Sequence, residues 1–297
     1  MKKICGLIVT YNPEIDVLRA VVCSLASNVD RIIIYDNGSD DVGAVFEGLS
    51  VSIEIPFLVQ EAKENIGIAG AQNWLLFRAK ELGYGYAILS DQDSIYPTNF
   101  ASSLFPVLAT NPRVAAVFPG WMDRNLGADM KYPGQFVFGK LGFLKINVDE
   151  EVIEISHAIA SGMLLNLNTL ADIGFMKADL FIDWVDNEWC WRANARGYRL
   201  LSLPSVKLSH SLGDKTVVFA GRKFVQRGLE RNYYIVRNAL FIMLHSEFGF
   251  GIRFYLLKKL IHHSFFSVIL SDEKLKQLRF LARAYVDGTL SRLGKLK

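Results

Sequence analysis

Short apolar runs that alternate with helical segments constrain the fold of this chain most. The runs have the length and β-branched content of buried strands, and they are Lys3–Val9, Arg31–Tyr35, Ile53–Val59 and Tyr86–Leu89. Helical segments, Ile15–Ala26 and Trp74–Leu82, lie between them. This order predicts an α/β fold with a mostly parallel central sheet. Polar turns follow the strands at their carboxyl ends, where open α/β sheets bind ligands.

The second half of the chain continues the alternation less regularly. Expected helices are Pro97–Ala109, Thr169–Phe175 and a segment that enters from Phe181–Trp189 and ends at Arg196. Expected strands are Val114–Phe118, His157–Leu167 and the edge strand Leu200–Leu208. The loop-rich stretch Trp121–Ile155 is given no element, and the pattern is helical from Lys223 onward. We predict an α/β domain over residues 1–220, with halves of about 1–118 and 119–220, and a helical region over 221–297.

The composition favours a large core in a reducing compartment. Of 297 residues, 51% are hydrophobic and 21% are charged. The three cysteines are a sparse, odd set without metal-ligand spacing, which predicts free thiols and a cytosolic protein. The apolar run near Met1 is too short for a signal peptide, and no uncharged apolar stretch reaches the roughly 18 residues of a spanning helix.

Positive charge is concentrated in the C-terminal region. The whole chain has a net charge of +3, but residues from Arg222 onward hold 15 Lys/Arg and 5 Asp/Glu, a net charge of +10. This asymmetry predicts contact with an anionic surface, either a membrane leaflet or nucleic acid. One helical face is apolar and comprises Phe250, Phe254, Leu257, Ile261, Phe265 and Val268. Such a face favours the membrane interface, with packing on the main domain or a dimer interface as alternatives.

Two carboxylates stand one residue apart where the Tyr86–Leu89 strand ends. In Ser90-Asp91-Gln92-Asp93 a turn after the strand lets both carboxylates reach the same place. Hard oxygen ligands suit Mg²⁺ or Mn²⁺, which bridge phosphate oxygens. The segment predicts a metal–diphosphate site, and a solvated Asp-rich turn is the alternative.

Two other turns have the chemistry of a nucleotide site. Asp36, before Asn37-Gly38-Ser39, offers an acceptor for the N3–H of uracil or thymine, although a simple β-turn has the same sequence. The stretch Asn65–Gly70 puts two glycines before a helix, where a ligand can approach the backbone. Close packing of the helix on the sheet is the alternative.

Acids and aromatic residues are mixed near residue 186. Asp183, Asp186 and Glu188 lie among Trp184, Trp189 and Trp191. Aromatic walls withdraw a carboxylate from water, which raises its pKa toward a value useful for a general base. Acids that complement the dipole of a helix start are the alternative.

Histidine and arginine residues add further candidates. His210, followed by Gly213, could give an imidazole to a metal or diphosphate, although a lone histidine is often structural. Arg231, Tyr234, Arg237 and Asn238 occupy one helical side. This group could hold phosphate or could pack its helix onto the domain.

Together and in this order, the motifs resemble the family-2 inverting glycosyltransferases with a GT-A fold. The residues that carry the resemblance are Val9-Thr10-Tyr11-Asn12, Asp36-Asn37-Gly38-Ser39, Asn65 to Gly70, Asp91-Gln92-Asp93, Ser161-Gly162, Asp183 to Trp189, and His210 to Gly213. A narrower likeness is to bacterial rhamnosyltransferases of cell-surface polysaccharide synthesis. It is carried by Asp91 to Ser94, Phe181 to Trp189, Arg231 to Tyr234, and Asp287 to Gly294.

The resemblance implies roles for the matching residues. Residues 1–220 would be the GT-A catalytic domain, with a nucleotide-binding half and an acceptor half. Asp186 would be the catalytic base, although the family's usual Glu-Asp is Val185-Asp186 here. Nucleotide-sugar contacts would be Thr10, Tyr11, Asn12, Asp36, Asn65, Gly67, Gly70, Asn73, Asp91 and Gln92. Asp93 and His210 would hold Mg²⁺ or Mn²⁺; Trp184, Glu188 and Trp189 would contact the acceptor; Arg231 and Tyr234 would contact phosphate.

The implied reaction is direct displacement at an anomeric carbon. The expected donor is dTDP-L-rhamnose, and the expected acceptor is a glycan or a polyprenyl-linked glycan on the cytoplasmic face of the inner membrane, as in O-antigen synthesis. A UDP-sugar donor, a homo-oligomer and a non-catalytic scaffold are the alternatives. Nucleic acid is not expected as a partner, because the C-terminal region has aliphatic residues at helical spacing rather than a base-stacking surface.

Overall fold

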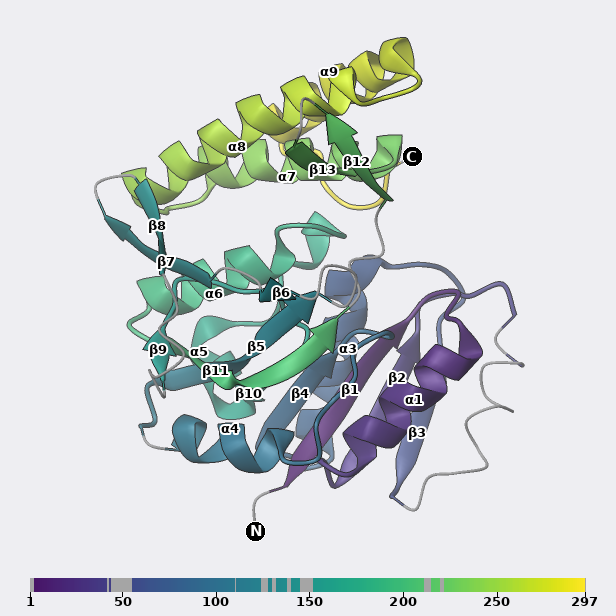
Figure 1. Ribbon diagram of the computed structural model, residues 1–297, viewed down its shortest axis with the longest axis vertical. Helices are drawn as coiled ribbons and strands as arrows, with labels where there is room; N and C mark the ends of the chain where they lie inside the picture. Colours follow the sequence, from purple (N-terminus) through teal and green to yellow (C-terminus); the bar gives the residue numbers. More distant parts are fainter. Residues whose placement is uncertain are drawn as a thin grey trace.

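A computed structural model describes most of the chain. The described residues are 3–41, 43, 55–109, 111–123, 128–129, 132–137, 140–144, 152–210, 215–219 and 222–296, and side chains are not described for 123, 128–144, 210, 215–216, 218–219 and 222–225. Figure 1 shows a sheet with helices on both faces and a group of helices at one end, beside the C-terminus.

The central sheet contains the strands that the sequence predicts. Its order is β3 (Phe57–Glu61), β2 (Arg31–Asp36), β1 (Ile4–Thr10), β4 (Tyr86–Ser90), β10 (Met163–Asn166), β5 (Val114–Asp123), β11 (Arg199–His210) and β9 (Ile153–Glu154), with β6 (Ala128–Asp129) paired to β5. The pairs β2–β3, β1–β2, β1–β4 and β5–β11 are parallel, whereas β10 is antiparallel to both β4 and β5. The long strands therefore point the same way, and the mostly parallel α/β fold is confirmed.

Continuous apolar sequence explains why β1 and β2 are interior strands of the sheet. All seven residues of β1 and five of the six in β2 are buried, as expected for strands covered on both faces. Helices α1 (Ile15–Ala26) and α4 (Phe100–Ala109) cover one face, and the buried side chain of Asn28 joins them through Pro97 O and Ala101 N.

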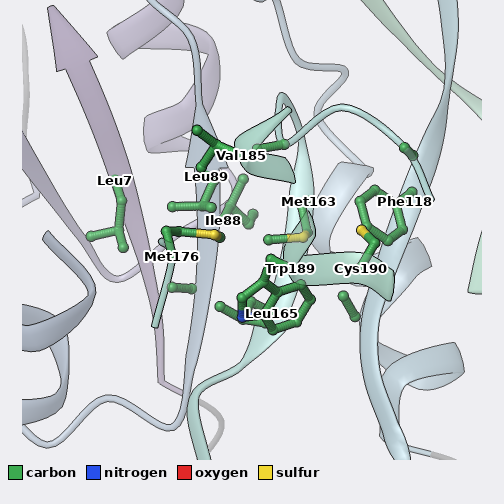
Figure 2. Packing of buried hydrophobic residues seen from close by; sticks show 14 of the residues in the cluster. Leu7, Ile88, Leu89, Phe118, Met163, Leu165, Met176, Val185, Trp189 and Cys190 are labelled. Carbon is green, nitrogen blue, oxygen red and sulfur yellow. The ribbon is translucent and has the colours of Figure 1, made fainter. Parts of the chain in front are cut away.

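The opposite face is covered by α3 (Gly67–Glu81) and α6 (Val185–Ala195). The short elements η1 (Leu167–Thr169), α5 (Leu170–Ile173) and η2 (Ala178–Leu180) connect β10 to α6. Figure 2 shows the core between this layer and the sheet, where Trp189 of α6 packs with Met163, Leu165 and Met176.

Three helices form the C-terminal region. They are α7 (Leu229–His245), α8 (Phe250–Ile269) and α9 (Lys274–Thr289). The tail after α9 contacts both parts of the molecule: Gly294 N donates to Asp179 O of the main domain over 2.8 Å, and Leu296 N donates to Tyr234 Oη of α7 over 2.7 Å. Two hairpin-like pairs, β7 (Tyr132–Val137) with β8 (Lys140–Leu144) and β12 (Lys215–Phe219) with β13 (Arg222–Gln226), lie outside the central sheet.

Several sequence-based boundaries need correction. Helix α3 begins at Gly67 rather than Trp74, because its first two turns are rich in glycine and alanine and show no clear apolar periodicity. Gly162 has φ of +79°, which breaks the expected His157–Leu167 strand and leaves only its second half as β10. Strand β11 is not at the edge, since β9 pairs with it, and residues 223–226 are a strand rather than a helix.

Smaller differences concern the ends of other elements. Helix α4 begins at Phe100, three residues after the expected start, and β3 ends at Glu61, two residues after the expected end. Parts of the unassigned stretch Trp121–Ile155 belong to β5, β6, β7, β8 and β9, and its residues 124–127, 130–131, 138–139 and 145–151 lie outside the described residues.

Candidate active site

The carboxyl ends of β1, β2 and β4 meet at one edge of the sheet. The pairing register sets Thr10 beside Asp36 and Ile8 beside Ser90. The polar turns that follow these strands are therefore neighbours, as the sequence predicts for a ligand site.

Asp36 organises the turn after β2. Its side chain is fully buried and accepts four hydrogen bonds. The donors are Thr10 Oγ1 at 2.9 Å, Gly38 N at 3.1 Å, Ser39 N at 2.8 Å and Ser39 Oγ at 2.6 Å. Four bonds use the acceptor positions of a carboxylate. A base N3–H can therefore bond to Asp36 only by replacing one of these donors, and the hydroxyl groups of Thr10 and Ser39 are the two that can rotate away.

The side chain of Gln92 connects the turn after β4 to the turn after β1 by hydrogen bonds. Its Oε1 accepts from Tyr11 N at 2.8 Å, and its Nε2 donates to Tyr11 O at 3.3 Å. The Tyr11 side chain remains 48% exposed and presents its ring at the edge of the site. Asn12 has φ of +44°. Its side-chain Nδ2 donates to Asp40 Oδ2, and its Oδ1 accepts from Asp40 N.

The Asn65–Gly70 turn is built by side-chain amides. Asn65 Oδ1 accepts from Asn37 Nδ2 at 3.1 Å and from Gly67 N at 2.9 Å, and Asn37 Oδ1 accepts from Ile66 N at 2.9 Å. A Cβ at Gly67 would lie 2.5 Å from Phe181 O, and Gly67 has φ of +81°. Packing against residue 181 therefore explains the first glycine of the turn. Gly70 faces only the side chain of Ile66, at 3.1 Å from its ideal Cβ.

Asp91 and Asp93 are both partly buried next to this edge. Their negative charges both act on buried Tyr96, and the charge of Asp91 also acts on Asp186. These two carboxylates, just after β4, are oxygen ligands of the kind that would fit Mg²⁺ or Mn²⁺. Among the described side chains no cluster of three or more His, Cys, Asp or Glu could hold a metal ion. His210 ends β11 opposite Asp123, and its side chain is outside the described part of the structure.

Asp186 lies in the first turn of α6, beside the start of β10. Its Oδ2 accepts from Ala160 N at 2.9 Å. Burial raises the pKa of Asp186 to about 7, although the Ala160 hydrogen bond lowers it, and the charges of Asp91 and Asp183 raise it further. A carboxylate with this pKa can accept a proton near neutral pH, as a general base must. Burial thus gives residue 186 the raised pKa that the sequence suggests for a carboxylate in this segment.

The backbone in front of Asp186 is strained. Phe181, Asp183 and Trp184 have φ of +67°, +61° and +64°, which is rare for residues other than glycine. Buried Asn238 of α7 holds this segment, because its Nδ2 donates to Leu180 O at 2.9 Å, Ile182 O at 2.7 Å and Asp183 O at 3.1 Å.

The sequence leaves two roles open for Asn238, a phosphate contact or packing of its helix onto the domain, and its hydrogen bonds to residues 180–183 favour packing. It gives Asn37 no role of its own. The motif Arg231-Asn232-Tyr233-Tyr234 drew attention to the right helix, but only the fold brings residue 238 to residues 180–183. The local signal for Asn37 is its place before Gly38 in the turn after β2, and only the fold brings it to the Asn65–Gly70 turn.

Two residues expected to contact the acceptor are structural instead. Trp189 lies fully buried among core residues, as Figure 2 shows, so it cannot touch an acceptor. Its Nε1 donates to Gly174 O. Glu188 is 6% exposed and forms a two-pronged pair with Arg192, at 2.9 Å and 2.8 Å. Arg192 also donates to Ile173 O and Phe175 O, so this pair fixes α6 on the preceding segment.

Asn73 and Tyr234 also differ from their expected roles. The side-chain amide of Asn73 is used by both backbone groups of Met176, each at 2.8 Å, so it is not available to a nucleotide. Tyr234 is 5% exposed, stacks on Phe181 and accepts from the C-terminal tail, so it does not face a phosphate.

Arg231 and Trp184 lie at the contact between α7 and the segment before Asp186. Arg231 pairs with Asp183 at 3.4 Å, and 42% of its side chain is exposed. Trp184 is partly buried and donates from Nε1 to Ile235 O. Both residues join the segment before Asp186 to the C-terminal helices.

Comparison with known proteins agrees with this geometry. A sequence model described as glycosyl transferase family 2 matches residues 6–174. The chain is 29% identical over 241 residues to the dTDP-rhamnosyl transferase RfbF of Shigella flexneri, covering 81% of this chain and 79% of the relative.

Two solved structures show the same fold. Residues 1–349 of S. aureus TarS superpose with a TM-score of 0.60 at 13% identity, covering 98% of this chain and 82% of that one. GalNAc-T7, solved with UDP, GalNAc and Mn²⁺, superposes with a TM-score of 0.58 at 13% identity, covering 89% of this chain and only 54% of that one. The GT-A fold is thereby confirmed, and because the family match spans more than half of its residues, this chain belongs to glycosyl transferase family 2.

Proposed function

We propose that this glycosyltransferase moves L-rhamnose from dTDP-L-rhamnose to a hydroxyl group of a glycan or lipid-linked glycan, with inversion at the anomeric carbon. The observation that carries the mechanism is the environment of Asp186, whose pKa of about 7 suits a general base and whose carboxylate feels the charge of Asp91, just after β4. The name of the Shigella relative supports dTDP-rhamnose as the donor.

In the proposed step, the acceptor hydroxyl gives its proton to Asp186 as its oxygen attacks the anomeric carbon. The bond from that carbon to the diphosphate oxygen breaks, and dTDP leaves with the electron pair. Tyr11, 48% exposed, would stack on the thymine, and Asp36 with Thr10 would shape the base pocket. A positioned base contributes about 10²–10⁴-fold to such a step.

A divalent metal is part of the proposal. Asp93 with Asp91 would hold Mg²⁺ or Mn²⁺ against the diphosphate, and His210 is a further candidate ligand. The ion supplies positive charge that neutralises the leaving group.

A thermal-shift panel tests the donor assignment. The protein is heated with dTDP, UDP, GDP or CDP, each with and without Mg²⁺ or Mn²⁺. A ligand at 100 times its dissociation constant adds about 2.7 kcal/mol of stability, which is a shift of several degrees for a chain of this size. Metal-dependent stabilisation by dTDP supports the proposal. Preference for UDP would instead select a UDP-sugar donor, and no response to any nucleotide would overturn the proposal.

We also propose that the enzyme works on the cytoplasmic face of a membrane, in the synthesis of a cell-surface polysaccharide. No helix among the described residues has the length and hydropathy to cross a bilayer. The outward face of α8 is apolar, since Phe250, Ile261 and Phe265 are 76%, 62% and 60% exposed. Arg253 and Lys258 flank this face, and the net charge of the region is positive. An amphipathic basic helix of this kind suits the surface of an anionic membrane.

Vesicle flotation tests the membrane contact. The protein should float with vesicles that contain phosphatidylglycerol, and high salt should release it because salt screens the charges. The double variant Ile261→Gln, Phe265→Gln should stay in solution. Binding to neutral and anionic vesicles alike would contradict the electrostatic part, and a stable dimer that the same variant dissociates would assign the face to a second copy.

A further inference from the structure

A charged side chain is buried where α7 meets the segment before Asp186. Arg237, in the middle of α7, is 1% exposed. Its guanidinium donates to three backbone carbonyl oxygens, which are Gly294 O at 2.6 Å, Leu180 O at 3.0 Å and Asp179 O at 3.4 Å. Burying a charge is costly unless its donors are used in this way. The contacts of Arg237 therefore fix its backbone partners relative to one another.

The tail after α9, residues 291–296, is one of the groups that the guanidinium holds. In Figure 1 this tail is the yellow loop beside α7. Gly294 uses both of its backbone groups, because its O accepts from the guanidinium and its N donates to Asp179 O at 2.8 Å. Leu296 N donates to Tyr234 Oη at 2.7 Å. The tail is thus fixed both to α7 and to the segment that precedes the candidate base.

The same guanidinium holds the start of the strained segment. Its two carbonyl partners there, at residues 179 and 180, stand directly before Phe181, whose φ is +67°. Asn238, the next residue of α7, bonds to the carbonyl groups of Leu180, Ile182 and Asp183. Asn238 Oδ1 in turn accepts from Arg237 Nε at 2.9 Å. Two adjacent residues of α7 therefore hold most of the carbonyl groups between residues 179 and 183.

Phe181 is enclosed on two sides. Its ring stacks on that of Tyr234, with centroids 5.1 Å apart and planes 18° apart. Its carbonyl oxygen faces the start of α3, where Ala69 N donates to it over 3.4 Å. Helix α3 bounds the segment on one side, so its support on the other side comes from α7 and from the tail that Tyr234 holds.

Two neighbouring tyrosines of α7 separate the tail from the rest of the helical region. Tyr233 and Tyr234 are 2% and 5% exposed, and both rings lie over the Arg237 guanidinium, at 5.5 Å and 4.8 Å. The hydroxyl of Tyr234 contacts the tail, whereas that of Tyr233 donates to Asp287 Oδ2 of α9 at 2.8 Å. Loss of one hydroxyl or the other therefore perturbs different contacts by the same chemical change.

Resting on the function proposed above, we infer that Arg237 is a positioning residue for catalysis, and that the tail after α9 is part of the framework that holds Asp186 in place. Arg237 acts through the backbone carbonyl groups of Asp179 and Leu180. Of the two roles that the sequence allows for this side of α7, a phosphate contact does not fit Arg237, because a side chain that is 1% exposed cannot meet a phosphate.

The test compares the wild-type protein with three variants. Arg237→Lys keeps the positive charge, but a single ammonium group does not reproduce the planar fork that joins the tail to the segment. Tyr234→Phe removes the contact with Leu296 and keeps the ring that stacks on Phe181, and it serves as a second variant in case Arg237→Lys does not fold. Tyr233→Phe is the matched control.

Three measurements are made on each folded protein. The first is kcat for dTDP release from dTDP-rhamnose, with an alkyl diphosphate sugar as a short lipid-linked acceptor. The second is the dissociation constant of dTDP with Mg²⁺. The third is amide hydrogen exchange of peptides that cover residues 179–186, where the amides of residues 180–182 are hydrogen-bonded.

Arg237→Lys should lower kcat about tenfold or more, and Tyr234→Phe about threefold or more, because small displacements of a catalytic group are costly in rate. The dissociation constant of dTDP should stay within about twofold in every variant. Exchange in the segment should be faster in these two variants than in wild type and Tyr233→Phe. An unchanged kcat in folded Arg237→Lys, or equal kcat in the two tyrosine variants, would overturn the inference.

A pH profile shows whether the effect acts through Asp186. Burial is the main cause that raises the pKa of Asp186 to about 7, and the charges of Asp91 and Asp183 raise it further. A looser segment admits water, so the rising part of the kcat/KM profile should move to lower pH in Arg237→Lys. It should not move in Tyr233→Phe. An unmoved profile in Arg237→Lys would mean that Arg237 does not act through the base, and would overturn the assignment.

Failure of this inference differs from failure of the proposed function. If dTDP binds the wild-type protein, but kcat and exchange in Tyr234→Phe match those in Tyr233→Phe, only the positioning role is wrong. If dTDP does not bind the wild-type protein, the donor assignment is wrong. The exchange comparison then still decides whether Arg237 and the tail hold the segment.

Discussion

Replacing Asn238 by alanine removes the amide that holds the strained backbone in front of Asp186. The side chain is fully buried, and its Nδ2 is within hydrogen-bond distance of Leu180 O, Ile182 O and Asp183 O. An NH₂ group has two protons, so at least two hydrogen bonds are lost, at about 1 to 1.5 kcal/mol each. Buried Arg237 also loses its acceptor Asn238 Oδ1, at 2.9 Å, which adds to this cost. We expect the variant to lose about 3 kcal/mol of unfolding free energy.

The same variant should lose activity for a second reason. Without the amide, the positive-φ conformations of Phe181, Asp183 and Trp184 can relax, and such residues store about 1–3 kcal/mol of strain each. Asp186 follows directly and would move with them. A displacement near 1 Å can cost about 10²-fold in rate, so kcat should fall at least tenfold even where the protein is fully folded.

Asn28→Ala is the matched control. Asn28 is also buried and joins backbone groups, with Pro97 O at 3.0 Å, Ser24 O at 3.1 Å and Ala101 N at 3.0 Å. It lies before β2 starts, whereas the site is where that strand ends. Urea unfolding followed by tryptophan fluorescence gives both stability losses, and dTDP release gives kcat. Equal kcat for the two variants, or a loss below about 1 kcal/mol for Asn238→Ala, would refute the reasoning.

Three further predictions concern the donor edge and α6. The rate should rise with pH up to an apparent pKa near 7, because Asp186 acts as a base in its ionised form. Asp183→Asn removes a negative charge that raises the pKa of Asp186, so it should move the rising part of the kcat/KM profile to lower pH. If the profile does not move, the rise belongs to another titrating group. Tyr11→Ala should raise the KM of a dTDP-sugar about tenfold with little change in kcat, since base stacking on an aromatic ring is worth about 1–3 kcal/mol; an unchanged KM would remove this ring from the donor site. Glu188→Gln should cost about 3 kcal/mol of unfolding free energy, because it leaves the mostly buried Arg192 without its anion. Chemical denaturation that shows no such loss would contradict a structural role for Glu188.

The strands of the nucleotide half were predictable because their local sequence agrees with their final environment. Strands β1 and β2 are continuous apolar runs and are buried on both faces, so length and composition were enough. Helix α3 was recognised too late in the chain, because Gly67 to Ala71 pack through small size rather than through a periodic apolar face.

The sequence predicted which segments form the candidate site, but not the role of each residue in it. Trp189 and Glu188 stand in a motif that resembles a functional one, yet long-range packing decides that both are buried. The spacing of Glu188 and Arg192 by four residues on a helix was a local signal for their pair, and it was not used. Asn238 could not be placed, because its three carbonyl partners are more than fifty residues away in the chain.

The most direct test of the central claim compares wild-type protein with Asp186→Asn in two measurements on the same samples. One is the rate of dTDP release from dTDP-rhamnose in the presence of an alkyl diphosphate sugar, and the other is the dissociation constant of dTDP with Mg²⁺. Removal of the base should lower the rate by about 10²-fold or more, while the dissociation constant stays within a few-fold. A variant that keeps its rate, or that loses nucleotide binding as strongly as turnover, would contradict the assignment of Asp186 as the base.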